Sequence, residues 1–325
     1  MLTRRNLAAL LIAGSASLLS GNAAAEAWPV RPVKVIVPFP AGGVPDLLAR
    51  VLGEKLAARF GQPFVVENRS GAGGNIGTEF AAKASPDGHV LLINASGPMV
   101  INPSLYPTLP FDPGKDFAPI SLLATVPNVL VVSRKFPAGD VKGFIAHAKK
   151  HPGHVTYGSI GNGSSQHLAA TQFETATGIR MTHVPYRAAN QAVADLVGGQ
   201  IDSMYQLVPN ILAQIHSGHV RALAVTTRER SAVLPAVPTM AELGVKDYDS
   251  EGWFGMFAPH KTPPEVVKQL NEAVREVLAD STVRKNLLDK GLVPQTNSPE
   301  EFGTFIERET VRWRRTVQES GAKID

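Results

Sequence analysis

Short runs of β-branched and apolar residues alternate with segments of helical periodicity through the first third of the chain. The run at 33–39 is rich in valine and stops at proline, which is typical of a strand. In residues 46–60, leucines and valines recur at the spacing of one helix face, and Gly61 follows as a stop signal. Continued, the pattern predicts strands at 64–68 and 90–94 and a helix at about 75–83. This order predicts a parallel sheet with helices on its faces.

The rest of the chain repeats this order and then becomes helical. Strands are predicted at 128–133, 156–158, 181–184, 201–205, 222–226 and 253–258. Helices are predicted at 141–150, 166–177, 188–198, 209–216, 264–279, 281–290 and 299–320. The sequence contains no internal repeat and no low-complexity tract.

Two segments are candidate boundaries between lobes. Residues 124–127 lie between strand-like runs, and residues 226–238 are polar and contain prolines. If the chain crosses between lobes at both places, the first lobe comprises residues 26–126 plus 228–325, and the second comprises residues 127–227. At ~150 residues per domain, 325 residues suit two domains. This is the layout of a hinged two-lobe receptor, although the pattern alone does not establish it.

The composition excludes several kinds of chemistry. The chain has no cysteine, so it has no disulfide scaffold, thiolate zinc site, iron–sulfur cluster or catalytic thiol. Hydrophobic residues make up 44% of the chain, which is too many for a disordered protein. Acidic and basic residues alternate along the chain without clustering, and this argues against a nucleic-acid partner.

The N-terminal residues 1–25 read as a cleavable signal peptide. A basic start with Arg4 and Arg5 precedes an apolar stretch from Leu7 to Leu19, and small residues follow at 23–25. We predict an exported, periplasmic protein. The paired arginines favour the twin-arginine route over the general secretory route, and a retained membrane anchor is the other alternative. Removing the two arginines leaves 30 basic against 28 acidic residues, so the net charge falls from +4 to +2.

The loop at 38–46 is the first candidate for ligand binding, because ligands of open α/β sheets sit beyond the carboxyl ends of the strands. Its residues Phe39, Ala41, Gly42 and Gly43 bring backbone close to any ligand, and a helix start there suits a carboxylate. Asp46 in the first helical turn is either a residue that complements the helix dipole or a ligand contact.

The loop at 158–167 is the second candidate and combines glycines with serines before a helix. Ser164 or Ser165 suits the cap of that helix, and the remaining polar groups can face a pocket. Capping alone is the alternative. We include Gly161, Gln166 and His167 in the predicted site.

Other motifs carry weaker signals. The loop at 71–77 resembles a dinucleotide loop but has Ile76 where the third glycine belongs, which leaves either a ligand-contacting turn or a plain connection. The serines lack the G-x-S-x-G context of a hydrolase, and His167 is too near them in sequence to serve as their base. His147 and His151 have metal-ligand spacing, but they lie at a predicted helix end without a carboxylate cluster.

Several aromatic residues lie at or near strand ends. Core packing is the default expectation for Tyr186, Tyr205, Trp253 and Phe254. Trp253 follows Glu251 and Gly252, so it is also a candidate wall of a pocket.

Short segments along the whole mature chain form an ordered series: VIVPFPAGG at 35–43, VVENR at 65–69, GAGGNIG at 71–77, ASPDG at 84–88, INPSLY at 101–106, KDFAP at 115–119, GNGSSQHL at 161–168, HVPY at 183–186, RALAVT at 221–226, VPT at 237–239, WFG at 253–255 and PEEF at 299–302. Together they resemble the Bug-type substrate-binding proteins of tripartite tricarboxylate transporters. The resemblance implies a periplasmic-binding-protein fold of two α/β lobes with a small carboxylate in the cleft. It also implies ligand contacts at 39–43 and 161–167, at Pro185 and Tyr186, and near Tyr205.

The chain departs from this family's pattern at three places. Val44 and Pro45 replace the usual hydroxyl residues, and Arg187 and Ala188 replace lysine and glycine. The acidic residue that commonly precedes a proline is missing from residues 206–209. These changes argue against an amino-acid ligand and favour an uncharged or aromatic carboxylate.

We therefore expect a monomeric receptor, without cofactor, metal or catalytic residues, that delivers a small organic acid to the membrane permease subunits of a tripartite tricarboxylate transporter. The alternatives are a ligand-sensing receptor for a signalling partner and a serine hydrolase on the same scaffold.

Overall fold

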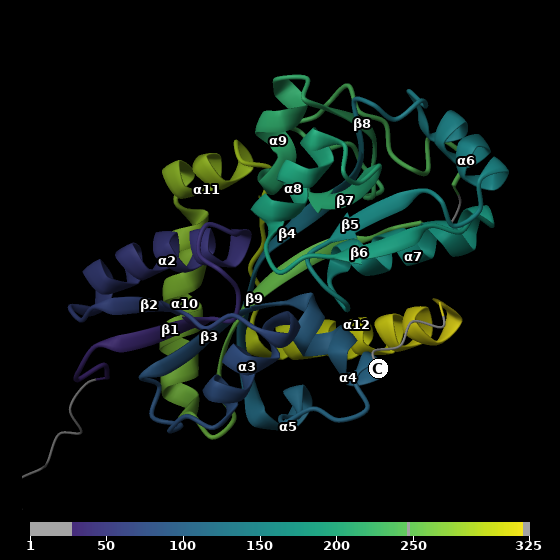
Figure 1. Ribbon diagram of the computed structural model, residues 1–325. Helices are drawn as coiled ribbons and strands as arrows, with labels where there is room; N and C mark the ends of the chain where they lie inside the picture. The colour runs from purple at the N-terminus through teal and green to yellow at the C-terminus, as the bar shows by residue number, and fades with distance from the viewer. Residues whose placement is uncertain (1–27, 246–247, 321–325) are drawn as a thin grey trace, which may run out of the picture.

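The protein is an α/β structure built round one curled mixed sheet (Figure 1). The computed structural model describes residues 28–245 and 248–320, so the predicted signal peptide at 1–25 lies outside the described residues. The strands are β1 (Val33–Val37), β2 (Phe64–Asn68), β3 (Val90–Ala95), β4 (Phe117–Ser133), β5 (Thr156–Ser159), β6 (Thr182–Pro185), β7 (Ser203–Leu207), β8 (Val220–Val225), β9 (Glu251–Pro259) and β10 (Val293–Pro294).

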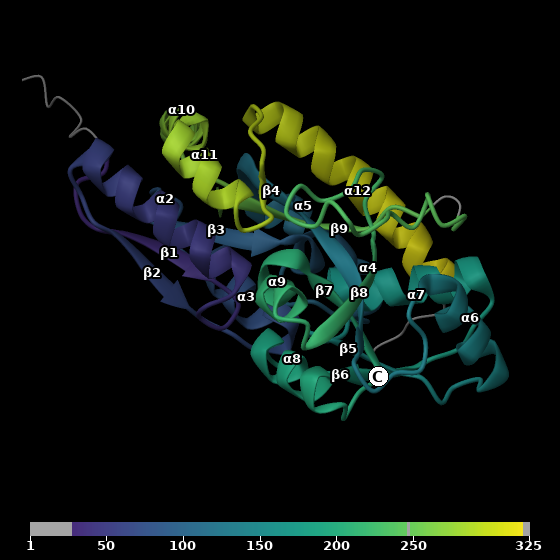
Figure 2. The ribbon, with the colours of Figure 1, turned by 90° about the horizontal axis from the view of Figure 1, so that it is seen from above.

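The helices cover both faces of this sheet. They are α2 (Val44–Phe60), α3 (Asn75–Ala82), α4 (Asn102–Leu105), α5 (Pro113–Asp116), α6 (Val141–Lys150), α7 (Ser165–Thr177), α8 (Ala189–Gly198), α9 (Val208–His216), α10 (Pro264–Ala279), α11 (Ser281–Leu288) and α12 (Pro299–Ser320), with the short turns η1 (Ala72–Gly74) and η2 (Gly97–Ile101). Seen from above, α10 and α12 lie along one side of the molecule and α8 along the other (Figure 2). Among the described residues, no helix is both long and apolar enough to cross a membrane.

The sheet order is β2-β1-β3-β9-β4-β7-β5-β6. Strands β1, β2 and β3 are parallel, and so are β5, β6 and β7, as the βαβ order of the sequence predicts. We call the side of β1–β3 the first lobe and the side of β5–β8 the second lobe. Between them, β4 pairs antiparallel with β9 as far as Pro127, and from Asn128 onward with β7 and β8.

The long strand β4 corrects two sequence-based expectations. It begins at Phe117 rather than at residue 128, and it runs unbroken through 124–127, which were expected to lie between two separate runs. The proline at 119 hid the strand, because proline lacks the N–H that a regular ladder uses. The register of β4 against β9 shifts next to Pro119, which accommodates the proline within the strand.

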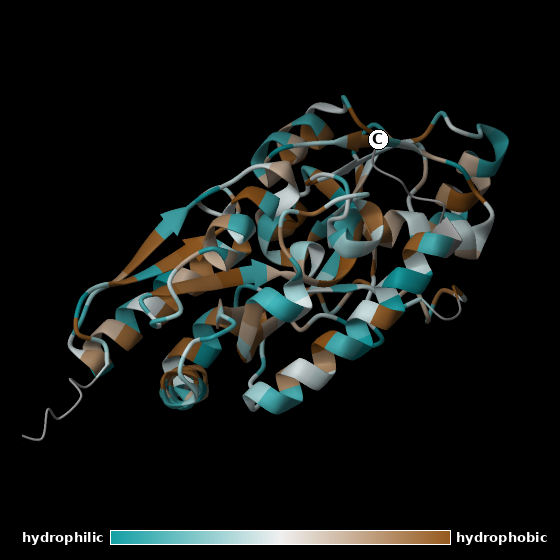
Figure 3. Cartoon of the chain, turned by 90° about the horizontal axis from the view of Figure 1, so that it is seen from below, coloured by the Kyte–Doolittle hydropathy of each residue, from teal (hydrophilic) through white to brown (hydrophobic). Residues whose placement is uncertain are grey.

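Each lobe buries hydrophobic residues on both faces of its part of the sheet. In β1, Val35 packs in the cluster that includes α2 and α10, whereas its neighbour Ile36 packs in the cluster that includes α12. In the second lobe, Leu130 and Val131 of β4 likewise face opposite clusters. Hydropathy colouring shows the strands largely hydrophobic and the long helices striped (Figure 3). Strands buried on both faces read as continuous apolar runs, which is why most of them were predictable.

The last helix, α12, belongs to the first lobe but also contacts the second. Its residues Phe302 and Trp313 are fully buried in the first lobe's core. Farther along, Thr316 accepts a hydrogen bond of 3.3 Å from the side-chain amide of Gln172 on α7. In Figures 1 and 2, α12 accordingly lies beside α7.

Candidate functional site

A cavity of about 470 Å³ lies between the two lobes, where the chain leaves several strands. Its wall is made by loops that follow β1, β3, β5, β6 and β7, by η1, and by the start of β9. The lining residues are Phe39, Pro40, Ala41, Gly42, Gly43, Val44, Pro45, Gly73, Ala95, Ser96, Gly97, Pro98, Ile160, Asn162, Gly163, Ser164, Ser165, Gln166, Arg187, Ala188, Ala189, Asn190, Leu207, Pro209, Asn210, Gly252 and Phe254. A volume of this size suits a small organic molecule.

Asp46 fixes the loop after β1 at the cavity through hydrogen bonds on the side of the loop that faces away from the cavity. The Asp46 carboxylate accepts hydrogen bonds from the backbone N–H of Gly42 at 3.0 Å and from two guanidinium nitrogens of Arg50, both at 3.0 Å. It also accepts one from Asn68 at 3.1 Å, and Asn68 donates to the Phe39 carbonyl as well. Asp46 is buried and lies outside the lining, so its position is that of a support for the loop.

The net effect of its surroundings is to lower the pKa of the Asp46 carboxyl. Burial alone raises the pKa of its carboxyl, but the hydrogen bonds from Arg50, Gly42 and Asn68 outweigh burial and lower the pKa below its ordinary value. The carboxylate is therefore ionised and fully engaged within the first lobe.

The loop after β5 places three of its predicted residues on the cavity wall. Ser164 caps α7: its hydroxyl oxygen accepts from the His167 backbone N–H at 3.3 Å, and its hydroxyl donates to the Gly161 carbonyl at 2.7 Å. The Ser165 hydroxyl donates to the side chain of Gln166, whose amide donates to Gln206. Ser164, Ser165 and Gln166 line the cavity, whereas Gly161 and His167 lie just behind it.

The serines are not arranged as a nucleophile with a base. The Nδ1 atom of His167 accepts a hydrogen bond from the backbone N–H of Gly163 at 3.3 Å, and the Ser164 hydroxyl is used in the cap. Within the described residues, no hydrogen bond joins the His167 ring to Ser164 or Ser165, so these two serines lack the histidine contact that a serine nucleophile uses.

Four helices begin at the cavity, and their N-termini give it a positive character. The first residues of α2, α7, α8 and α9, or the residues just before them, all belong to the lining. Free N–H groups and the positive end of the helix dipole favour an anion there. The lining contains one formally charged side chain, Arg187, and no aspartate or glutamate. The exposed Arg187 guanidinium forms no hydrogen bond or ion pair with another described residue.

The aromatic residues divide between the cavity and the core. Phe39 and Phe254 line the cavity. Trp253 packs edge-on against Phe302 and Phe305 in the first lobe's core, with ring centroids 5.9 and 5.4 Å apart. Because neighbouring strand residues face opposite sides, Gly252 and Phe254 turn to the cavity and Trp253 turns away.

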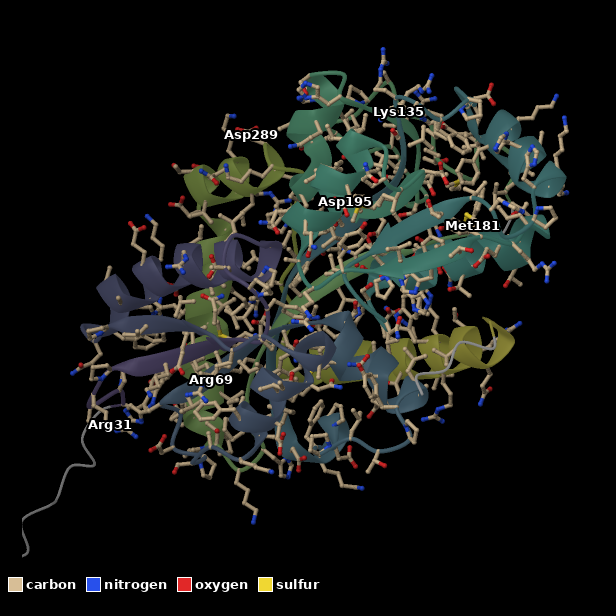
Figure 4. The ribbon with its side chains drawn as sticks, viewed as in Figure 1. Arg31, Arg69, Lys135, Met181, Asp195 and Asp289 are labelled. Atoms are coloured by element: carbon tan, nitrogen blue, oxygen red, sulfur yellow. The ribbon has the colours of Figure 1, made fainter. Side chains whose placement is uncertain are left out.

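Three further predicted residues in the second lobe lie outside the lining. Tyr205 is fully buried in the second lobe's core. Pro185 ends β6, and the Tyr186 hydroxyl donates a hydrogen bond of 2.8 Å to the Asp195 carboxylate. Figure 4 labels Asp195 on α8. The predicted second-lobe segments are therefore near the cavity, but other residues of those segments form its wall.

The sequence reasoning missed part of the wall. Ser96, Gly97 and Pro98 follow β3, so the rule that selected the loops after β1 and β5 also applied to them. Asn190 and Asn210 lie in the first turns of α8 and α9, where polar residues usually serve as surface or cap residues, and no sequence motif marked them.

Comparisons with known proteins identify the family of this chain. Residues 48–322 match the family model described as "Tripartite tricarboxylate transporter family receptor". Protein BugT of Bordetella pertussis is 38% identical over 307 residues, which are 94% of each chain. The structure titled "R. palustris Rpa4515 with adipate" is 36% identical, covers 91% of this chain and all of its own, and superposes with a TM-score of 0.88. MatC (Rpa3494) from Rhodopseudomonas palustris, with bound malate, is 33% identical, covers 89% and 100%, and superposes with a TM-score of 0.84.

These matches agree with the segments that resemble Bug-type proteins, and they confirm the expected two-lobe periplasmic-binding-protein fold. Both the sequence match and the superposition extend over nearly the whole described chain. The protein is a member of the tripartite tricarboxylate transporter receptor family.

Proposed function

We propose that this protein captures a small organic carboxylate in the interlobe cavity and delivers it to the permease subunits of a tripartite tricarboxylate transporter. The observation that carries the proposal is the convergence of four helix N-termini and one arginine on a cavity without acidic side chains. Relatives with adipate and with malate bound support the same ligand class.

The ligand we propose lacks an ammonium group. An amino acid needs a carboxylate or several well-placed acceptors for its amine, because a buried unpaired charge is costly. Asp46 directly follows the lining residue Pro45, but its carboxylate is already bound by Arg50 and Asn68 and lies outside the lining. Phe39, Val44 and Phe254 provide apolar wall for the body of the acid.

Capture would proceed by movement of the two lobes about their crossing points. We propose lobes of residues 26–126 plus 228–325 and of residues 127–227. The change in the pairing of β4 between Pro127 and Asn128 supports the first crossing. We propose a monomer that acts by binding alone, since Ser164 is used as a helix cap and His167 as a backbone acceptor.

To deliver its ligand to a permease, the receptor has to lie on the periplasmic side of the cytoplasmic membrane. The family is one of periplasmic receptors, and we propose that residues 1–25 are a signal peptide with Arg4 and Arg5 directing twin-arginine export. We favour transport over sensing because the family model is that of a transporter receptor.

A thermal-shift screen tests the ligand class. Mature protein is heated with mono-, di- and tricarboxylates, aromatic acids, amino acids and sugars. An acid present at 100 times its Kd stabilises the folded protein by about 2.7 kcal/mol. We expect shifts from carboxylates and none from the corresponding amino acids. A response to sugars with none to any carboxylate would overturn the proposal.

A pair of tryptophan substitutions locates the binding. Ala41 is an exposed residue of the cavity wall, whereas Ala58 is exposed near the far end of α2. Ala41→Trp fills part of the cavity and is expected to abolish the shift, while Ala58→Trp keeps it. Equal shifts in the two variants would place the ligand elsewhere.

A further inference from the structure

Three aromatic rings form a continuous stack behind the serine loop, residues 159–164. The His183 ring on β6 lies between the rings of Tyr157 on β5 and His167 on α7. Ring centroids are 4.9 Å apart with an interplanar angle of 18° on one side, and 4.3 Å apart with 17° on the other. The stack therefore ties three elements of the second lobe together directly beneath a wall of the cavity.

Both histidines hold backbone groups of the serine loop. His167 Nδ1 accepts from the Gly163 N–H at 3.3 Å. His183 Nε2 is hydrogen-bonded to the Ser159 hydroxyl at 2.6 Å, and the same hydroxyl oxygen accepts from the Gly161 N–H at 3.1 Å. Two N–H groups of the loop are thus fixed, one directly and one through a serine, by imidazole nitrogens.

The first lobe leaves this loop no room on its other side. A Cβ atom added to Gly163 would lie 2.4 Å from Asn102 Oδ1 and 2.9 Å from Leu105 Cδ1. A Cβ atom added to Gly97 would lie 3.2 Å from the Gly163 carbonyl oxygen. The loop is enclosed between the histidine stack and the first lobe, so its exact position depends on what the histidines hold.

We propose that His167 and His183 are positioning residues that set the binding conformation of the serine loop, with His167 acting as a hydrogen-bond acceptor for Gly163. This inference rests on the proposed function, because the loop forms part of the proposed carboxylate site. It gives both histidines a role distinct from filling the core, and it assigns that role to the uncharged form of each ring.

The surroundings of the stack favour uncharged rings. Burial lowers the pKa of His167 to about 4, and burial together with the neighbouring His167 lowers that of His183 to about 3. Burial and the charge of Glu174 act on Tyr157, the third ring of the stack, and Tyr205 and Tyr248 lie in the same core cluster as Tyr157. None of these neighbours is a cation. Glu174 accepts from the Met181 N–H, so its carboxylate is engaged away from the imidazoles.

Two substitutions of His167 separate an acceptor from a space-filling ring. Asparagine places Oδ1 close to the position of Nδ1, so His167→Asn keeps the acceptor and loses the ring. His167→Phe keeps a stacked ring and loses the acceptor. With adipate and malate as probes, we expect His167→Asn to bind within about threefold of the unmodified protein. His167→Phe is expected to bind at least about tenfold more weakly, the scale of one lost hydrogen bond, whatever its thermal stability. The opposite ranking would overturn the proposal.

A second measurement needs no ligand, so it separates this inference from the proposed function. In the ligand-free protein, NMR of the His167 ring nitrogens should show the proton on Nε2 at pH 7 and titration near pH 4. The Gly163 amide resonance should move with the same midpoint, and this movement should be absent in His167→Asn. A proton on Nδ1, or a Gly163 amide that does not follow His167, would overturn the inference even if carboxylates bind. Absence of carboxylate binding with these NMR results would overturn the proposed function alone.

Discussion

Among the described residues, Arg187 is the one lining residue whose side chain adds a formal charge to the cavity. It follows Pro185 and Tyr186 at the end of β6, in the loop that leads into α8. Its side chain is exposed at the cavity wall and has no carboxylate partner among the described residues. A guanidinium in that situation is available to a second anionic group on a ligand whose first carboxylate sits on the helix N-termini.

Substitution of Arg187 should therefore discriminate between acids by charge. For Arg187→Ala we expect affinity for adipate or malate to fall roughly five- to tenfold, the range of a partly exposed charged hydrogen bond, and affinity for monocarboxylates to fall less. Isothermal titration calorimetry measures both. Arg180→Ala, which removes an exposed arginine outside the lining, is the control for net charge. Equal losses for mono- and dicarboxylates would show that Arg187 does not contact a second anionic group.

Residue type predicted which loops form the cavity wall better than it predicted which side chains contact the cavity. Gly42, Gly43 and Ser164 were found because glycine and serine before a helix leave backbone N–H groups available. Trp253 lies in the core, as the default expectation had it, and not in the pocket wall, because successive side chains of a strand point to opposite faces. Arg187 and Asn190 were outside the predicted set, since a lone polar residue carries no motif.

The serine loop is one element at which the lobes touch, and glycine makes that contact possible. Gly163 has φ of 77° and no room for a side chain beside Asn102. Gly153, in the turn before β5, has φ of 76° but open space around it. The two glycines therefore share the same left-handed backbone conformation and differ in their neighbours.

This pair isolates the lobe contact from backbone strain. Gly153→Ala should cost about 1–2 kcal/mol of unfolding free energy, because alanine disfavours a left-handed backbone, and Gly163→Ala should cost more, because its methyl group also meets Asn102. Gly163→Ala should in addition weaken carboxylate binding by on the order of tenfold, since the new methyl group pushes the loop from Asn102. Urea unfolding and calorimetry check the two effects. Full affinity in Gly163→Ala would mean that the lobes do not need this close contact to bind ligand.

Elements were predictable where a cap or a periodic face marked them. Helices α6, α10 and α12 and strand β2 have the predicted bounds, and α7 begins one residue earlier than predicted, with Ser164 as its cap. Only the part of β4 from residue 128 onward was predicted, because prolines interrupt the pattern of its first half and its two halves serve different lobes. A single sequence shows local periodicity, but it does not show that one strand changes partners midway.

At the scale of the whole molecule, a titratable carboxyl group lies at the crossing between the two lobes. Glu251 begins β9 opposite Pro127, and it lines a second cavity of about 440 Å³ between the crossing segments. Burial raises the pKa of Glu251 to about 7, and the charges of Asp249 and Glu309 add to this effect against smaller opposing contributions from Thr125 and Arg312. A carboxyl group that resists ionisation thus lies at the junction of both lobes.

This position predicts how the stability of the molecule depends on pH. The pKa of Glu251 is higher in the folded protein than in the unfolded chain, so the folded state binds more protons between about pH 4.5 and 7. Its contribution to stability is therefore present at low pH and lost as the pH rises through 7. Glu251→Gln should match the unmodified protein near pH 4.5 and exceed it by about 1–3 kcal/mol at pH 8, measured by urea unfolding across that range. Glu272→Gln, at an exposed position of α10, is the control and should leave the pH dependence unchanged. If Glu251→Gln and Glu272→Gln gave the same pH profile, the crossing would carry no titrating carboxyl group.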